Sequence, residues 1–217
     1  MTRPALPRSR AGAGARAVRL AVPVALTLAL AGCVSIGDKA ELAVYAPQVR
    51  IDAADAPPAL DLTLAVGEPN SSTMLDSNRI AVRPRPLTLQ VYGGAVWADT
   101  APALVQAALV DAFGESERFR AVVRPTDSIG ADRLLRPALR PFWAVYADGA
   151  KRPTVVVELQ ATLVDQRRHR VIASRRFRAE QPAERERLDD VVPAFEAALG
   201  EVATAMLPWL LEAARGD

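Results

Sequence analysis

Alternation of apolar and polar residues predicts most of the β-strands in this chain. The alternation is clearest over TVVVELQATLV, residues 154–164, where the odd-numbered positions form one apolar face. A polar turn at 165–170 follows, and residues 171–179 return with the same period, which is the pattern of a β-hairpin. The same alternation predicts further strands at residues 60–66, 79–83, 87–92 and 119–123.

Two stretches of the chain break these strand patterns. In the apolar run LLRPALRPFWAVY, residues 134–146, Pro137 and Pro141 remove two backbone donors. Proline is confined to sheet edges and bulges, so the run predicts an edge strand or a bulged strand. Gly93 and Gly94 follow the strand at 87–92, and we interpret them as a turn.

Apolar residues at spacings of three and four predict two helices. The first begins with Asp99 or Thr100 as its cap, has Pro102 in its first turn and ends near Gly114. The second covers about residues 188–214, and we expect Pro208 to kink it or fray its last turns.

The order of these elements predicts an α/β (α+β) fold. Strands come first, then a helix, a strand, a hairpin and the long helix. Two main helices can cover one face of a mixed β-sheet, which gives a single two-layer sandwich. The domain is expected at residues 59–214, and its length suits one hydrophobic core.

Residues 1–32 have the pattern of a secretory signal peptide. An apolar run covers residues 20–30 and is followed by small residues. A run of about a dozen residues is shorter than the roughly 20 that a membrane span needs. Every charged residue before Asp38 is an arginine: Arg3, Arg8, Arg10, Arg16 and Arg19.

The end of this segment, Leu30-Ala31-Gly32-Cys33, resembles the bacterial lipobox, in which the cysteine receives diacylglycerol and becomes the lipidated N-terminus. Ordinary secretion, with cleavage by a general signal peptidase and a free thiol at Cys33, is the alternative. Cys33 is the single cysteine of the chain, so an internal disulfide is excluded. We therefore predict lipidation at Cys33.

Residues 33–58 are expected to form a lipidated N-terminus and a tether. Glycine, proline and charged residues interrupt every periodic pattern there. A short extended piece, residues 45–51, can still dock on the domain. A spacer of this kind lets a domain stand clear of lipid headgroups.

Charge and residue types argue against nucleic-acid binding and catalysis. The chain has 27 Lys and Arg against 25 Asp and Glu, a net charge of +2. Removal of residues 1–32 takes away five arginines and no acid, which leaves a mature net charge near −3. The lone histidine, His169, lies in the hairpin turn, and no Walker, GxSxG or GxGxxG motif is present. We expect no enzyme, no cofactor and no metal site.

Three regions are candidate partner-docking surfaces. Tyr92 and Trp97 flank the two glycines and could present their rings to a partner, although burial of Trp97 in the core is the simpler alternative. Trp209 near the end of the last helix could extend beyond the core. The hairpin segment 167–178 carries six arginines, which protect an edge from aggregation or dock against acidic protein or lipid phosphate.

Several blocks resemble the ABC-type transport auxiliary lipoprotein family, which includes the PqiC-type lipoproteins. They occur in order behind the lipobox, between about Leu60 and Trp209. The matching blocks are MLDSNRIAVR (74–83), VYGGAVWAD (91–99), APALV (101–105), VIASRRF (171–177) and VVPAF (191–195).

The resemblance implies a non-enzymatic periplasmic accessory of a lipid transport system between the inner and outer membranes. Its implied partners are an MCE-domain protein (MlaD- or PqiB-like) and an ABC permease with its ATPase, and it implies a homo-oligomeric ring. Val34 after the cysteine is not the aspartate of inner-membrane retention, so the outer membrane is expected. An outer-membrane assembly or envelope-structural lipoprotein without an ABC partner remains the alternative.

Overall fold

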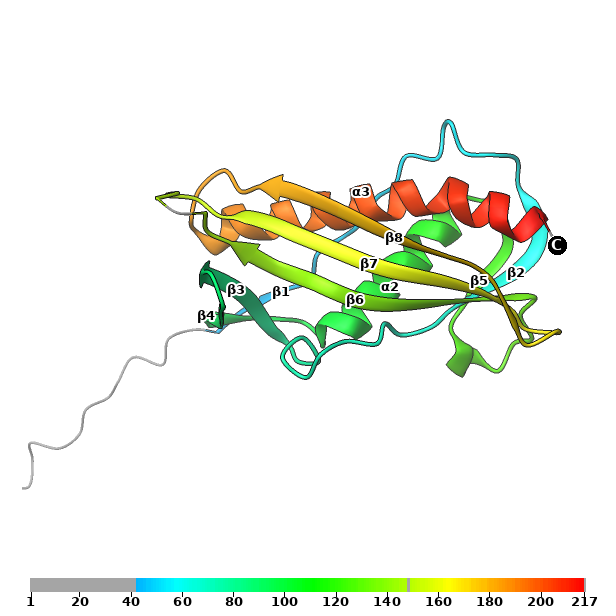
Figure 1. Ribbon diagram of the computed structural model, residues 1–217, viewed down its shortest axis with the longest axis horizontal. Coiled ribbons are helices and arrows are strands. Elements are labelled where there is room, and N and C mark those ends of the chain that lie inside the picture. The colour runs from blue at the N-terminus through cyan, green and yellow to red at the C-terminus, as the bar shows by residue number, and fades with distance from the viewer. Residues whose placement is uncertain (1–41, 148, 217) are drawn as a thin grey trace, which may run out of the picture. The chain divides into compact units, whose positions relative to one another are not determined.

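A computed structural model describes residues 42–147 and 149–216 (Figure 1). The chain divides into two compact units, residues 1–40 and 41–217, and the described residues belong to the second unit. The predicted signal peptide and Cys33 lie outside the described residues. The architecture is therefore that of the second unit alone.

The second unit contains eight strands, two long helices and one 3-10 turn. The elements in chain order are β1 (Ala43–Tyr45), β2 (Leu60–Val66), β3 (Arg79–Arg85), β4 (Thr88–Trp97), α2 (Ala101–Glu115), β5 (Phe119–Val123), η2 (Pro125–Asp127), β6 (Arg133–Val145), β7 (Thr154–Asp165), β8 (Arg170–Pro182) and α3 (Leu188–Arg215). Every strand and helix expected from the sequence is present.

The strands form one mixed sheet that forks at β6. On one side, β6, β7 and β8 are antiparallel neighbours over nearly their full lengths. On the other side, the first residues of β6 pair with β2 and its last residues pair with β3, both in parallel. The sheet therefore divides into two arms, one of β3, β4 and β1 and the other of β2 and β5.

Both helices cover the same face of this sheet, which confirms the two-layer α+β prediction (Figure 1). The odd-numbered residues of β7, from Val155 to Leu163, are at most 1% exposed and face the helices. Helix α3 packs on β7 and β8, whereas α2 packs on β2 and β5. Thr100 caps α2 through its side-chain oxygen, as the sequence predicted.

The edge-strand interpretation of residues 134–146 was wrong, and the bulge interpretation was right. Strand β6 is central, and its register with β7 shifts between Leu139 and Phe142, where Pro141 lies. The carbonyl of Pro137 accepts a hydrogen bond from the Asn70 amide at 3.1 Å. The amide position and carbonyl of one strand residue face the same edge, so the proline removes no bond from the β6–β7 ladder.

The turn expected at Gly93-Gly94 was also wrong. Strand β4 runs through both glycines to Trp97. Ala81 pairs with Val91, and Arg79 with Val96, so extra residues of β4 bulge between these two pairs. Gly94 lies in this bulge at a φ of +71°, a left-handed conformation that glycine adopts without steric cost.

Residues 45–58 form an extended strap along α3. The Tyr45 hydroxyl donates to Asp189 Oδ1 at 2.7 Å, and the Gln48 amide donates to Glu196 Oε1 at 2.8 Å. Near the other end of α3, Arg215 donates to the Pro58 carbonyl. The expected docking of residues 45–51 is observed, and docking continues to residue 58. The compact unit thus begins before residue 59.

One glycine of α3 permits the close approach of this strap. A Cβ atom on Gly200 would lie 3.0 Å from the Arg50 carbonyl oxygen, so any larger residue would push the strap away. The neighbouring Val49 is 8% exposed and joins the core. Burial of Val49 ties the strap to the core, and Tyr45, Ile51, Ala53 and Ala56 pack against the core as well.

Helix α3 continues past Pro208 to Arg215, so the expected fraying of its last turns does not occur. Its length and mean hydropathy of 1.3 would suit a membrane span, but 61% of the relevant window is buried inside the domain. A core helix of a soluble domain has the same properties. The burial therefore favours a role for α3 as the core helix of the sandwich.

Candidate functional site

Trp97, a predicted docking residue, belongs to the core. It is 1% exposed, and its ring lies 5.1 Å from Phe195 and 5.9 Å from Phe142 between centroids. Phe142 and Phe195 lie 4.9 Å apart and complete an aromatic triangle between sheet and helix. The docking interpretation is corrected because this side chain points inward from the end of β4. Burial of Trp97 in the core, the simpler alternative, is observed.

Tyr92, the second docking candidate, is half-buried beside Tyr146, which directly follows β6. Burial, followed by the neighbouring hydroxyl of Tyr146, raises the pKa of Tyr92 above its ordinary value. Close by, the Arg83 guanidinium lies 5.4 Å from the ring centroid of Trp143. Tyr92 is therefore partly buried beside Tyr146, and only part of its ring is open to a partner.

Trp209, the third candidate, is half-buried on α3. Its ring meets Phe177 of β8 edge to face, with centroids 5.4 Å apart. The Arg175 guanidinium belongs to the same cluster and lies 5.3 Å from the Phe177 centroid. Part of Trp209 remains exposed, so it is still a candidate for docking.

The arginines of the β7–β8 hairpin are matched by carboxylates. Asp165 accepts the backbone amides of Arg167 and Arg168, both at 2.9 Å, and its other oxygen lies 3.2 Å from Arg133 Nη1. Asp132 bridges Arg167 and Arg120 at 2.8 and 2.9 Å. The exposed His169 occupies this turn at a φ of 52°, as a turn residue.

These contacts keep both aspartates ionised. The Thr63 amide, followed by Arg167 and Arg120, lowers the pKa of Asp132 against an opposing effect of burial. The Arg168 amide, followed by the Arg167 amide and by Arg133, does the same for the pKa of Asp165. A carboxylate with a lowered pKa and several fixed donors is a structural group, and it is a poor general acid.

The sheet face that carries no helix is polar. Glu158, on this face of β7, is only 9% exposed because Arg176 and Arg178 of β8 cover it at 3.4 and 3.3 Å. Arg178 also pairs with Glu180 at 2.6 Å. Most arginines of segment 167–178 thus have carboxylates as neighbours, which weakens the prediction that they dock an acidic partner.

A hollow of about 650 Å3 lies where the sheet forks. Its rim includes Glu68, Asn70, Asp76 and Arg136. Residues 42–147 and 149–216 contain no group of three or more His, Cys, Asp or Glu side chains able to hold a metal ion.

The exposed tip of the β3–β4 hairpin was not predicted. Leu87, which we expected inside a strand, is the tip residue of this hairpin, 97% exposed at a φ of 62°. Pro84 lies within β3 and Pro86 directly precedes Leu87, and this pair of prolines was the available signal that a turn follows.

A family model described as "ABC-type transport auxiliary lipoprotein component" matches residues 42–207. The chain belongs to this family. The match begins at the first described residue and includes the strap, so residues 42–58 are part of the family domain. The description of this family is that of a lipoprotein, which indicates a membrane-anchored protein of the cell envelope.

Known relatives of this auxiliary lipoprotein agree with the fold. A Xanthomonas campestris protein of the DUF330 family is 37% identical, and its crystal structure superposes with a TM-score of 0.74 over 80% of this chain and 98% of that one. A second, uncharacterized protein has a TM-score of 0.60 at 18% identity, covering 78% of this chain and 99% of its own, and shows the fold alone.

One curated relative comes from Bradyrhizobium diazoefficiens and is itself described as uncharacterized. It is 31% identical over 153 residues, which is 69% of this chain. The matched region spans 40% of the length of that relative. The larger protein therefore contains sequence beyond the auxiliary lipoprotein domain.

Proposed function

We propose that this protein is the lipid-anchored accessory of an MCE/ABC-type system that moves lipid between the inner and outer membranes. It is held through lipid on Cys33, faces the periplasm and sits at the outer membrane. Its partners are an MCE-domain protein and an ABC permease with its ATPase. The family match over residues 42–207, behind a lipobox, is the observation that carries the proposal.

The chemistry of the described residues supports a docking role over a catalytic one. Asp132, Asp165 and Glu158 are each held by arginines or backbone amides. Each is therefore committed to holding strands together. A general acid needs a raised pKa and room for substrate, and the lowered pKa values of Asp132 and Asp165 are the opposite arrangement.

Partner capture tests the accessory role. The lipidated full-length protein is extracted from membranes in mild detergent with a C-terminal tag, and co-purifying proteins are identified by mass. An MCE-domain protein or its ABC permease is expected. Repeated capture of outer-membrane β-barrel proteins alone would overturn the proposal and favour the alternative, an outer-membrane assembly lipoprotein.

Cys33→Ala tests the anchor separately. Without the thiol no diacylglycerol can be attached, so we expect an unprocessed precursor without incorporated palmitate. Cys33→Ser is the matched control, because it removes the thiol but keeps a polar side chain of similar size. It is expected to give the same unprocessed precursor as Cys33→Ala. A Cys33→Ala protein that is processed and membrane-bound as before would contradict lipidation at this residue.

A further inference from the structure

Four of the seven large apolar side chains that are exposed among the described residues lie at one end of the domain. Leu87 is 97% exposed, Leu42 54%, Val44 62% and Val91 37%. All four belong to the arm of β1, β3 and β4 or precede it directly. Figure 1 shows this arm at the end opposite the β7–β8 turn. Surface leucines occur singly on most proteins, but a group on one projecting element marks a contact surface.

The backbone conformation at Leu87 is also unusual for a leucine. Leu87 has a φ of 62°, a left-handed conformation that is strained for a residue with a Cβ atom. Glycine or asparagine is the usual residue for such a turn. A branched apolar side chain that is held in this conformation and is 97% exposed points to a contact outside the domain.

The charge around this tip suits a phosphate surface. Residues 79–92 contain three arginines and no carboxylate. Arg85, next to the tip, is exposed and donates to Thr88 Oγ1 at 3.3 Å, which holds the guanidinium beside the turn. The neighbouring loop is tied to this hairpin by a 3.0 Å bond from the Tyr146 amide to the Arg83 carbonyl. Its exposed Lys151 and Arg152 line a hollow with Glu184 and Glu186, so the positive charge nearest the tip is that of Arg85.

The covalent chain allows this tip to face the membrane that holds Cys33. Strand β1 runs parallel to β4 with Ala43 beside Ala95, so its first residue is the one nearer the tip. Leu42, which precedes Ala43, is level with Gly94 in this register. Seven residues, or about 23 Å of strand, separate Gly94 from Leu87. Cys33 lies nine residues before Leu42, and an extended chain of that length spans up to about 30 Å.

We propose that the β3–β4 tip inserts Leu87 into the phospholipid surface next to the lipid anchor, with Arg85 at the level of the phosphates. The proposal rests on the lipid anchor described above. A single apolar tip residue binds a bilayer weakly, but the anchor keeps it at the surface, so the tip sets the orientation of the domain. The β7–β8 turn then points away from the membrane.

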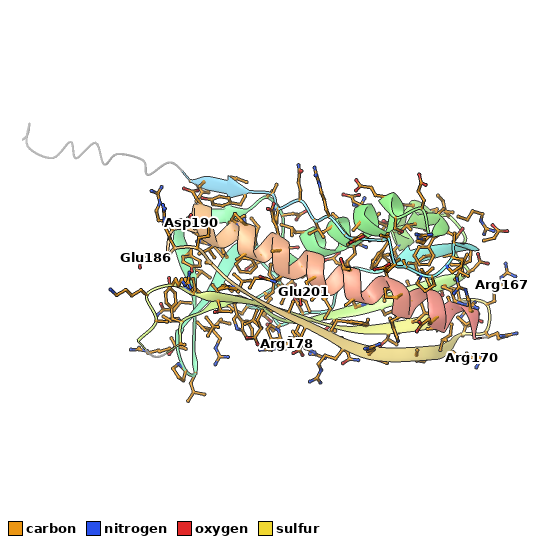
Figure 2. All side chains as sticks on the ribbon, turned by 90° about the horizontal axis from the view of Figure 1, so that it is seen from above. Arg167, Arg170, Arg178, Glu186, Asp190 and Glu201 are labelled. Carbon is orange, nitrogen blue, oxygen red and sulfur yellow. The ribbon has the colours of Figure 1, made fainter. Side chains whose placement is uncertain are left out.

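A site-specific fluorophore tests this orientation. Because Cys33 is the chain's single cysteine and is acylated in the mature protein, Leu87→Cys provides one thiol for an environment-sensitive NBD label. Val171→Cys is the matched control, since Val171 is 60% exposed and adjoins Arg170 at the opposite end of the domain (Figure 2). Both lipidated full-length proteins are reconstituted into vesicles of phosphatidylethanolamine and phosphatidylglycerol.

The label at position 87 is expected to shift to shorter wavelength and to be quenched at least about two-fold more by headgroup-proximal nitroxide lipids than the label at position 171. Equal quenching at the two positions would overturn the proposal. Shielding that appears in detergent without lipid, and grows with protein concentration, would also overturn it and indicate contact with a second copy.

Failure of the anchor itself gives a different result. An unacylated Cys33 would take up a second label, and the intact mass of the protein would show two labels in place of one. That result would contradict the proposed anchor, whereas a single label without quenching would contradict the tip contact alone. Arg85→Glu is expected to weaken quenching at position 87, whereas Arg170→Glu, its distal counterpart, is expected to leave it unchanged.

Discussion

The hairpins at the two ends of the sheet differ in what their arginines contact. At the arm end, the β3–β4 hairpin carries arginines without carboxylates and an apolar tip residue in a left-handed conformation. At the other end, the β7–β8 turn carries arginines that Asp132 and Asp165 hold through side-chain and backbone contacts. Figure 2 shows Arg167 and Arg170 far from Glu186 and Asp190. The arginines of the two hairpins therefore have different contacts.

The comparison shows that the role of an arginine in a hairpin depends on the group that its guanidinium contacts. Around the β7–β8 hairpin, arginines such as Arg133 and Arg176 have carboxylate partners, so their charge is already used in holding strands together. In the β3–β4 hairpin the guanidiniums of Arg83 and Arg85 contact a tryptophan ring and a threonine hydroxyl, which are uncharged groups. We expect the first hairpin to govern stability and the second to govern contacts with other molecules.

The largest expected effect comes from the base of the arm. Trp97→Ala removes one corner of the aromatic triangle and should lower the free energy of unfolding by about 3–5 kcal/mol. Urea denaturation followed by far-UV circular dichroism measures this loss. Trp97→Phe is the control, because Trp97 Nε1 has no hydrogen-bond partner among the described residues and phenylalanine keeps most of the contact. A loss below about 1 kcal/mol for Trp97→Ala would mean that the arm is not fixed through the core.

At the β7–β8 end, Asp132→Ala removes the acceptor shared by Thr63, Arg120 and Arg167. The expected loss is about 1–2 kcal/mol, kept small because both arginines are largely exposed. Asp55→Ala, in the strap, is the matched control with no expected change. An equal effect of the two substitutions in urea denaturation would contradict a structural role for Asp132.

Acid should destabilise the same end. Folding lowers the pKa of Asp132 and Asp165, so below about pH 5 the unfolded chain binds more protons than the folded chain. Their stabilising effect is complete above the unfolded pKa of about 4 and is lost as the pH falls through the folded pKa values.

Urea midpoints measured from neutral to acidic pH test this expectation. The double variant Asp132→Asn with Asp165→Asn should show a shallower fall with pH than the unsubstituted protein. Hydrogen exchange should accelerate first around residues 165–170. Identical pH profiles of the two proteins would show that other carboxylates control acid unfolding.

The smallest effect is expected at the tip and has the opposite sign. Leu87→Gly relieves the left-handed strain but makes the unfolded chain more flexible, so a net gain of about 0.5 kcal/mol is expected. Thermal unfolding measures this gain, and Leu89→Gly, within β4, should instead destabilise the protein. A loss of stability in Leu87→Gly would show that the tip leucine supports the fold.

The arrangement of strands and helices was predictable because each element carries its own periodicity. The alternation over residues 154–164 and the stripe of α3 are local properties, and burial of one face enforces them. Pro137 was misinterpreted because its effect depends on which edge its nitrogen faces, and Asn70, from a distant loop, occupies that edge. The bulge at Gly94 likewise depends on its pairing with β3.

The candidate sites were harder to predict than the fold. Trp97 beside two glycines has the same local sequence whether it faces a partner or the core, and only the position of α3 decides between them. The exposure of Leu87 depends on the turn conformation. The carboxylates that match the hairpin arginines come from β7, β8 and the loop before β6, so no spacing in the sequence reveals them.

The strap has a mechanical consequence for a protein pulled through its N-terminus. Tension at Leu42 acts first on the three residues of β1 and then on a few hydrogen bonds spread along α3. Neither the β6–β7–β8 ladder nor the packing of α3 on the sheet carries load until the strap has peeled away. Release of residues 42–58 would add roughly 50 Å of extended chain while the rest of the domain stays folded.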